Sequence, residues 1–262
     1  MELATVLYTV ENHVATILMN QPKSLNPMND ASMDDMLVAL NAAAADPDVK
    51  AVVLRGAGRA FCGGGDINYF VDAVKEPNFG LQPLVQKVGK VLLAIRALPK
   101  PVIAAVQSAA AGGGCNLVLA CDYVVAADNA KFIEAFVNIG LAPDTGGVYW
   151  LPRLVGPQRA FEMMSTGRPV LAQEALALGM VNEVVEVDKL EERAYEMAAK
   201  YAAGPSVAYA NLKKMMNRSM FPELADYLNL EALAMDECSK TEDFVEGITA
   251  FKEKRKAVYQ GK

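Results

Sequence analysis

The stretches GRAFCGGGDI at residues 58–67 and AAAGGGCNL at residues 109–117 hold the most informative pattern in this 262-residue chain. Each places three consecutive glycines shortly after an apolar run that predicts a buried strand, residues 51–54 in one case and 102–106 in the other. Glycine has no Cβ, so the main chain can approach a ligand closely at both turns. The second run opens a predicted helix, and the free N–H groups at the start of a helix favour negative charge.

Two such turns lying side by side would direct two main-chain N–H groups at one developing oxyanion. The alternative is that each run forms only a tight turn or a close contact between a strand and a helix. Other glycine-rich motifs are excluded. The chain has no GxxxxGK[ST] phosphate-binding loop, and GAGRAF at residues 56–61 lacks the third glycine or alanine of a dinucleotide-binding motif.

Outward from these turns, strand and helix patterns alternate, which predicts an α/β fold with parallel pairing through right-handed crossovers. A hairpin is expected over residues 3–19, further strands at 51–54, 102–106 and 123–126, and helices at 30–45, 87–98 and 116–120. After residue 187 only helical patterns follow: 188–203, 206–218, 223–238 and one beginning at Thr241. We therefore expect an α/β core with the active site over residues 1–187 and a helical annex over residues 188–262.

Composition limits the functional classes. Hydrophobic residues make up 53% of the chain and charged residues 21%, which favours a large core. The net charge of −6 and the pI near 5.0 argue against a nucleic-acid-binding surface. The first residues, MELAT, lack a signal-peptide pattern, and the apolar run 101–111 is too short to span a bilayer. A cytoplasmic protein without a membrane partner is expected.

Metal binding is also disfavoured. The four cysteines form no Cys-x-x-Cys pair, and His13 is the only histidine, so a zinc site is hard to assemble. We expect reduced thiols, no metal and no separate cofactor.

The two turns resemble those of the crotonase, or enoyl-CoA hydratase/isomerase, superfamily. FCGGGDI at residues 61–67 is similar to the family's F-C-A-G-A-D-[LI] turn, and residues 111–122 are similar to its second glycine turn and helix. The resemblance extends over essentially the whole chain and is closest in motif to the phenylacetate-pathway-type enoyl-CoA isomerases. Further similar segments are QPKSLN at 21–26, KPVIAAV at 100–106, LPRLVG at 151–156, LGMV at 178–181 and FKEKR at 251–255.

The resemblance implies a spiral of ββα units with a C-terminal helical region that forms homotrimers or dimers of trimers. It implies an oxyanion hole made by the N–H groups of Gly65 and Gly113, and an acyl-CoA thioester as the substrate, with coenzyme A belonging to that substrate. Asp66 is also expected to anchor the first turn. The expected substrate and CoA contacts are Lys23 and Leu25, the first turn at Gly63, Gly64, Asp66 and Ile67, and, from the last helix of a neighbouring subunit, Phe251 and Lys254.

Two glutamates with which hydratases of this family activate water are missing. By the resemblance, their positions are taken by Asn116 and Phe136. Neither an amide nor a phenyl ring can serve as a base at neutral pH. Glu134 lies two residues from Phe136, a displacement of about 6.6 Å in an extended segment, which is too far for proton transfer at the same carbon. We expect Glu134 to be exposed or structural.

Asp144 is the candidate base. It lies in LAPDTGG at residues 141–147, where the resembling hydratases carry glycine and some enoyl-CoA isomerases carry an acid. An aspartate in Pro-Asp-Thr-Gly would otherwise be an ordinary turn residue. The hypothesis is that Asp144 moves a proton between two carbons of a dienolate held by the glycine amides. An apolar wall including Phe136 and Ile139 would exclude water and raise the pKa of the base.

The leading interpretation is a Δ3-Δ2-type enoyl-CoA isomerase, acting in fatty acid metabolism or aromatic degradation. Two alternatives stay open: an enoyl-CoA hydratase or lyase that uses Asp144 alone, and a non-catalytic acyl-CoA-binding member of the superfamily. His13 lies in the predicted first hairpin turn, which argues against a histidine-based triad and against aryl-CoA dehalogenation. Cys62 and Cys115 flank the glycine turns, but small buried thiols are common and no chemistry is assigned to them.

Overall fold

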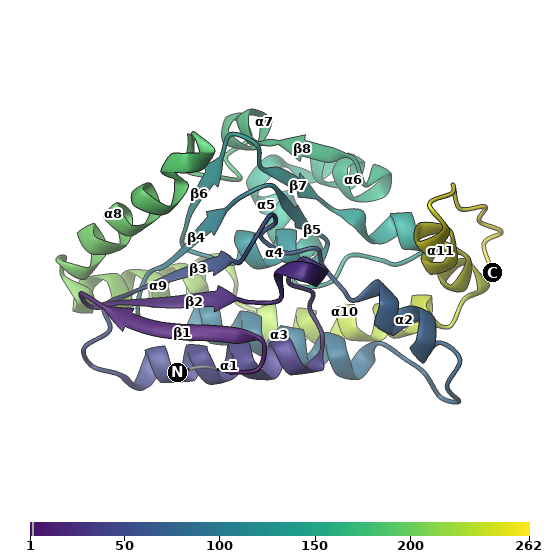
Figure 1. Ribbon diagram of the computed structural model, residues 1–262, viewed down its shortest axis with the longest axis horizontal. Coiled ribbons are helices and arrows are strands. Elements are labelled where there is room, and N and C mark those ends of the chain that lie inside the picture. Colours follow the sequence, from purple (N-terminus) through teal and green to yellow (C-terminus); the bar gives the residue numbers. More distant parts are fainter. Residues whose placement is uncertain (2) are drawn as a thin grey trace.

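A six-stranded sheet forms the centre of the computed structural model, which describes Met1 and residues 3–262 (Figure 1). A two-residue turn with positive φ at Asn12 and His13 closes the opening hairpin. The predicted hairpin and parallel pairing are confirmed. The antiparallel pair is β1 (Val6–Glu11) and β2 (Val14–Met19), and the strands that continue the sheet in parallel are β3 (Ala51–Gly56), β4 (Val102–Val106), β6 (Tyr123–Ala127) and β9 (Glu183–Val185).

Helices cover both faces of this sheet. Side chains alternate along a strand, so Val52 and Leu54 of β3 pack toward α1 (Asp30–Ala45) and α3 (Gln82–Ala97). Val53, between them, faces the other side and packs against α8 (Leu190–Ala202). Both faces are therefore buried at the centre of the sheet, which explains why the central strand β4 is apolar without interruption.

A small second sheet lies beside the first glycine turn. It consists of β5 (Ala109–Ala111), β7 (Lys131–Ile133) and β8 (Pro169–Leu171), and α4 (Gly113–Leu119) begins two residues after β5. The remaining elements are the helices α2 (Ile67–Ala73), α5 (Gly147–Val155), α6 (Pro157–Thr166), α7 (Ala172–Ala177), α9 (Ser206–Met220), α10 (Leu224–Ser239) and α11 (Glu242–Glu253), and the 3-10 helices η1 (Pro22–Ser24), η2 (Ala135–Ile139) and η3 (Val187–Lys189).

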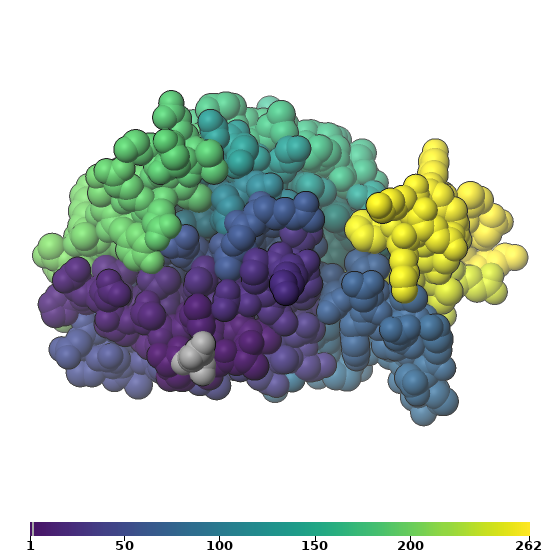
Figure 2. Space-filling view, in the orientation of Figure 1, coloured from purple at the N-terminus to yellow at the C-terminus, as the bar shows by residue number. Residues whose placement is uncertain are grey.

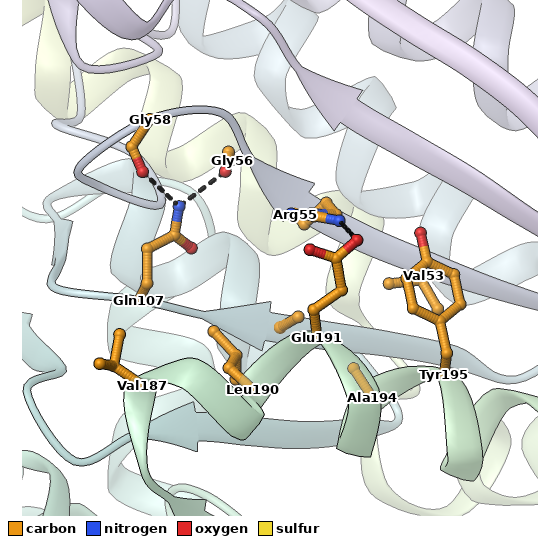
Figure 3. A pocket seen from close by; sticks show the side chains of 11 residues that line it. Val53, Arg55, Gly56, Gly58, Gln107, Val187, Leu190, Glu191, Ala194 and Tyr195 are labelled. Atoms are coloured by element: carbon orange, nitrogen blue, oxygen red, sulfur yellow. Dashed lines mark hydrogen bonds and ion pairs between the residues drawn. The ribbon is translucent and has the colours of Figure 1, made fainter.

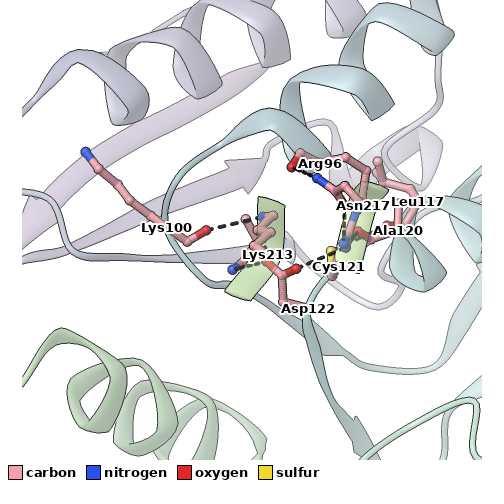
Figure 4. A network of polar contacts seen from close by, with 9 residues as sticks. Arg96, Lys100, Leu117, Ala120, Cys121, Asp122, Lys213 and Asn217 are labelled. Carbon is pink, nitrogen blue, oxygen red and sulfur yellow. Dashed lines mark hydrogen bonds and ion pairs between the residues drawn. The ribbon is translucent and has the colours of Figure 1, made fainter. Parts of the chain in front are cut away.

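A buried ionic network attaches α9 to the core (Figure 4). The Lys213 ammonium donates to Asp122 Oδ2 at 2.6 Å, and Arg96 of α3 donates to Asp122 Oδ1 at 3.0 Å. Arg96 also donates to Asn217 Oδ1 of α9, and Asp122 Oδ2 accepts the Val102 N–H at 2.9 Å. The helices α8 and α9 belong to the expected annex, and both pack on the α/β core. The division of the chain at residue 187 into a core and an annex stays a prediction.

The last helix forms a lobe next to α2 (Figure 2). Phe244 of α11 packs against Phe70 and against Phe79, with ring centroids 6.0 and 6.2 Å apart. At Gly247 a Cβ would lie 2.6 Å from the main chain of Ile139, so this glycine lets α11 lie directly on η2. None of the described helices is both long and apolar enough to cross a membrane.

Candidate active site

The two glycine turns lie side by side. The N–H of Cys62 donates to Ala109 O at 3.2 Å, and the N–H of Ala111 donates to Cys62 O at 3.0 Å. Gly64 has φ +88°, and a Cβ there would lie 2.8 Å from Ala111 O. Glycine is therefore required at this position, both for the backbone conformation and for the close approach of the turns.

The Gly65 and Gly113 amides have no acceptor among the described residues. Gly113 is the first residue of α4, a position whose N–H has no intrahelical partner. A Cβ on Gly113 would lie 2.7 Å from Met28 Sδ and 2.8 Å from Thr145 Oγ1. Both glycines line the same cavity, so two main-chain donors without an acceptor border one space.

Asp144 enters this cavity from the loop between η2 and α5. Its Oδ1 accepts a hydrogen bond from Thr145 Oγ1 at 2.6 Å, and its main-chain oxygen accepts the Gly147 N–H at 2.9 Å. Because Thr145 Oγ1 also lies beside the position a Gly113 Cβ would occupy, the carboxyl group is close to the start of α4. The turn thus presents Asp144 next to one of the two free amides.

Burial sets the ionisation of Asp144. The residue is 8% exposed, and this desolvation raises the pKa of Asp144 to about 6, although the Thr145 hydroxyl group opposes the shift. A carboxyl group with such a pKa is ionised near neutral pH and is a stronger base than an exposed aspartate.

The cavity has a volume of about 360 Å³. Apart from main-chain groups, its polar lining is limited to Asn138, Asp144 and Thr145, and Asp144 is the one ionisable side chain among the described lining residues. Predicted site residues that it brings together are Leu25, Gly63, Gly64, Gly65, Ile67, Gly113, Phe136, Ile139, Asp144 and Phe251.

Three predicted contact residues lie outside the cavity lining. Lys23, in η1, and Lys254, at the C-terminal end of α11, are exposed. Asp66 accepts the Tyr69 N–H at 3.2 Å and so caps α2. Phe251 reaches the cavity from α11 of the same chain, because Gly247 lets this helix lie on η2. The family resemblance implied instead that this residue comes from a neighbouring subunit.

Two further carboxyl groups, those of Glu134 and Glu231, lie behind Asp144. The sequence did not indicate that either residue lies next to the site. Glu134 is 3% exposed, so the alternative of an exposed side chain was wrong. Glu231 of α10 is 4% exposed and lies 87 positions away from Asp144 in the sequence. Desolvation raises the pKa of each glutamate to about 8. The helical pattern of residues 223–238 gave no sign that one of its members reaches the site.

A second hollow at the carboxyl ends of β3 and β4 is a poorer candidate (Figure 3). Its polar groups are already paired: Arg55 with Glu191, and the Gln107 amide with Gly56 O at 2.6 Å and Gly58 O at 3.2 Å. It therefore offers no free acid, base or pair of converging donors. Within the described residues, no group of three His, Cys, Asp or Glu side chains is placed to hold a metal ion.

Comparison with known proteins identifies the family to which this sequence is related. Residues 9–262 match the family model described as enoyl-CoA hydratase/isomerase. A trans-2-decenoyl-[acyl-carrier-protein] isomerase of Streptococcus mutans is 35% identical, and a probable enoyl-CoA hydratase of Rhodobacter capsulatus is 39% identical, each over 100% of both chains. The crystal structure of an enoyl-CoA hydratase from Mycobacterium avium subsp. paratuberculosis superimposes with a TM-score of 0.90 and 35% identity, covering 99% of this chain and 100% of that one.

These relatives carry the names of both isomerases and hydratases, so they establish the family and leave the reaction open. The match to the family model and the full-length similarity confirm the crotonase-type fold that the family resemblance implied. The chain belongs to the enoyl-CoA hydratase/isomerase family, the crotonase superfamily.

Proposed function

We propose that the chain is an enoyl-CoA isomerase that moves a C=C bond by one position through a dienolate. The observation that carries the proposal is that Asp144 is the one ionisable side chain in the described lining of a cavity that also contains two free amides. Moving a double bond requires one base that takes a proton and returns it, whereas the two-glutamate hydration needs a second carboxylate facing the substrate.

In the proposed reaction, the Gly65 and Gly113 amides bind the thioester oxygen of a 3-enoyl-CoA. The Asp144 carboxylate removes a proton from C2, and the electrons form a dienolate whose negative charge the amides stabilise. The same proton then passes from Asp144 to C4, which leaves the double bond between C2 and C3. No water is consumed, and Asp144 returns to its ionised form.

The cavity lining supports an aliphatic acyl group. Met28, Phe70 and Leu81 line the cavity, together with an apolar strip of α3 that packs with Met235 and consists of Leu84, Val85 and Val88. A volume of about 360 Å³ corresponds to roughly a dozen groups of the size of a water molecule. We therefore propose medium-length, uncharged chains, with 3-enoyl-CoAs of different lengths as the test.

The assembly belongs to the proposal as well. Apolar side chains of α9 and α10 are exposed in the single chain, among them Val207 at 77%, Met215 at 62% and Leu230 at 60%. Exposed apolar surface of this kind supports association between chains, and the assembly that we propose is a homotrimer or a dimer of trimers. Sedimentation of the purified protein distinguishes these states.

The deciding experiment compares the wild type with Asp144→Asn on 3-enoyl-CoA and on 2-enoyl-CoA. We expect migration of the double bond in the wild type and a loss of about 10²- to 10⁴-fold in kcat in the variant. Binding of a saturated acyl-CoA serves as the control for folding and should change little. Retained turnover in Asp144→Asn refutes the role of the base. Formation of 3-hydroxyacyl-CoA by the wild type would favour a hydratase, and tight binding without turnover would favour a non-catalytic protein.

A further inference from the structure

The turn at residues 144–146 carries one carboxyl group, that of Asp144, which faces the cavity. Two further carboxyl groups lie on either side of this turn. Glu134 approaches from the end of β7 and Glu231 from α10. All three are at least 92% buried. The turn is thus enclosed by acids from separate parts of the chain.

Hydrogen bonds connect both glutamates to the main chain of the turn. Asn116 Nδ2 donates to Asp144 O at 2.8 Å and lies 3.4 Å from Glu134 Oε2, so this amide joins Glu134 to the base. On the other side, the Gly146 N–H donates to Glu231 Oε2 at 2.8 Å. One acid therefore holds each end of the turn, one directly and one through Asn116.

The backbone of the turn needs such support. Thr145 has φ +57° and Gly146 has φ +74°, so two consecutive residues occupy the left-handed region. This conformation is strained for a β-branched residue and persists only where its surroundings enforce it. Trp150 Nε1 adds a third contact, to Thr145 O at 3.2 Å. These contacts hold the main chain of the turn on which Asp144 lies.

Charge balance limits how many of the acids ionise. No ion pair to Asp144, Glu134 or Glu231 exists among the described residues, and one oxygen of each glutamate has no hydrogen-bond partner. Burying several carboxylates without a cation is strongly unfavourable. Since burial raises the pKa of Asp144 to about 6 and that of each glutamate to about 8, Asp144 ionises first.

The other titratable groups facing the cluster do not supply a compensating charge. The Cys115 thiol lies beside Glu134, and burial raises its pKa well above the usual value. Tyr227 of α10 lies beside Glu231, and burial raises the pKa of this tyrosine as well. Arg153 contacts Tyr149 instead of an acid: its Cζ lies 3.8 Å from the ring centroid, and its Nη1 donates to Tyr149 O at 2.6 Å.

We propose that Glu134 and Glu231 are positioning residues, which as neutral acids hold the turn that presents Asp144 and leave Asp144 as the single negative charge beside the substrate. This inference rests on the proposed function, because it takes Asp144 as the base. A second negative charge next to a developing dienolate would raise the barrier to its formation. Activity should therefore rise as Asp144 ionises and fall as the glutamates do.

The first test is the pH dependence of kcat/KM in the wild type and in the double variant Glu134→Gln/Glu231→Gln. We expect a bell-shaped wild-type profile with limbs near pH 6 and pH 8. The double variant should keep the limb near pH 6 and lose the falling limb, because glutamine remains neutral. An unchanged falling limb overturns the proposal.

The second test separates positioning from stability. Glu134→Ala and Glu231→Ala should lower kcat by about 10- to 100-fold with KM nearly unchanged, because a displaced base loses its geometry. The glutamine variants should retain wild-type kcat at pH 7. Glu237→Ala, on the exposed face of α10, is the matched control and should have no effect. Wild-type kcat in both alanine variants overturns the proposal.

A readout without turnover keeps this inference distinguishable from the proposed function. Titration of the ¹³C-labelled glutamate carboxyl groups by NMR, assigned with the glutamine variants, should show Glu134 and Glu231 protonated up to about pH 8. Titration near the ordinary value of 4.5 overturns the neutral-acid assignment, whatever the reaction is. Absence of double-bond migration in the wild type would instead refute the proposed function.

Discussion

Replacing Glu134 with glutamine should stabilise the protein, and increasingly so as the pH rises. The pKa of Glu134 is about 8 in the folded chain, against an ordinary value of 4.5. Below pH 4.5 the group is protonated in both the folded and the unfolded state, so it makes no difference to the pH dependence. Between pH 4.5 and 8 the unfolded chain releases this proton and the folded chain retains it. Folding stability therefore falls as the pH rises, by about 1.4 kcal/mol per pH unit.

Glutamine has nearly the same shape and no proton to lose, so it avoids this penalty. Integrated over the shift, the gain of Glu134→Gln over the wild type should grow by roughly 3 kcal/mol between pH 5 and pH 7.5. The assay is chemical denaturation followed by circular dichroism at both pH values, at one fixed protein concentration, because assembly also affects stability.

Glu76→Gln provides the control, since this side chain is exposed and the substitution removes the same formal charge. Its effect should be small and nearly independent of pH. A gain in Glu134→Gln that is the same at both pH values, or a loss at pH 7.5, would refute the reasoning that a buried neutral acid lies behind the base.

Three further predictions concern the site and the core. The rate of double-bond migration should rise about tenfold per pH unit below pH 6 and level off between about pH 6 and pH 8, because burial raises the pKa of Asp144 to about 6 and only the ionised form is a base. A rate already constant from pH 4 upward would contradict this. Gly113→Ala should lower kcat by about 10²-fold or more, since the added Cβ would lie 2.7 Å from Met28 Sδ and displace the amide, as steady-state kinetics can show. Lys213→Met should destabilise the fold by about 3–5 kcal/mol in denaturant titrations, by leaving Asp122 short of a buried partner, whereas the exposed neighbour Lys214→Met should have little effect.

Much of the fold could be predicted from local pattern. The predicted bounds of the apolar strands 102–106 and 123–126 agree with those of β4 and β6 to within one residue. Both strands are buried on both faces, so their apolar runs are uninterrupted. The two glycine runs indicated the close approach that Gly64 makes to Ala111 O. These features depend on neighbouring residues, so the sequence displays them directly.

The surroundings of Asp144 depend on distant residues and could not be predicted in this way. Glu231 follows the ordinary spacing of a helix, and only the packing of α10 brings it to the Gly146 N–H. The distance of Glu134 from Phe136 along the chain does not indicate its contact with Asn116, which lies on another element. Whether Phe251 of the same chain reaches the cavity depends on how α11 folds back on η2, which the local sequence does not determine.

A structure with a bound, non-reacting acyl-CoA tests the central claim most directly. The account predicts a thioester oxygen about 2.7–3.1 Å from the nitrogens of both Gly65 and Gly113, with an Asp144 oxygen about 3–3.5 Å from the carbons that exchange the proton. A thioester oxygen held by other groups, or an Asp144 carboxyl group out of reach of those carbons, would contradict it.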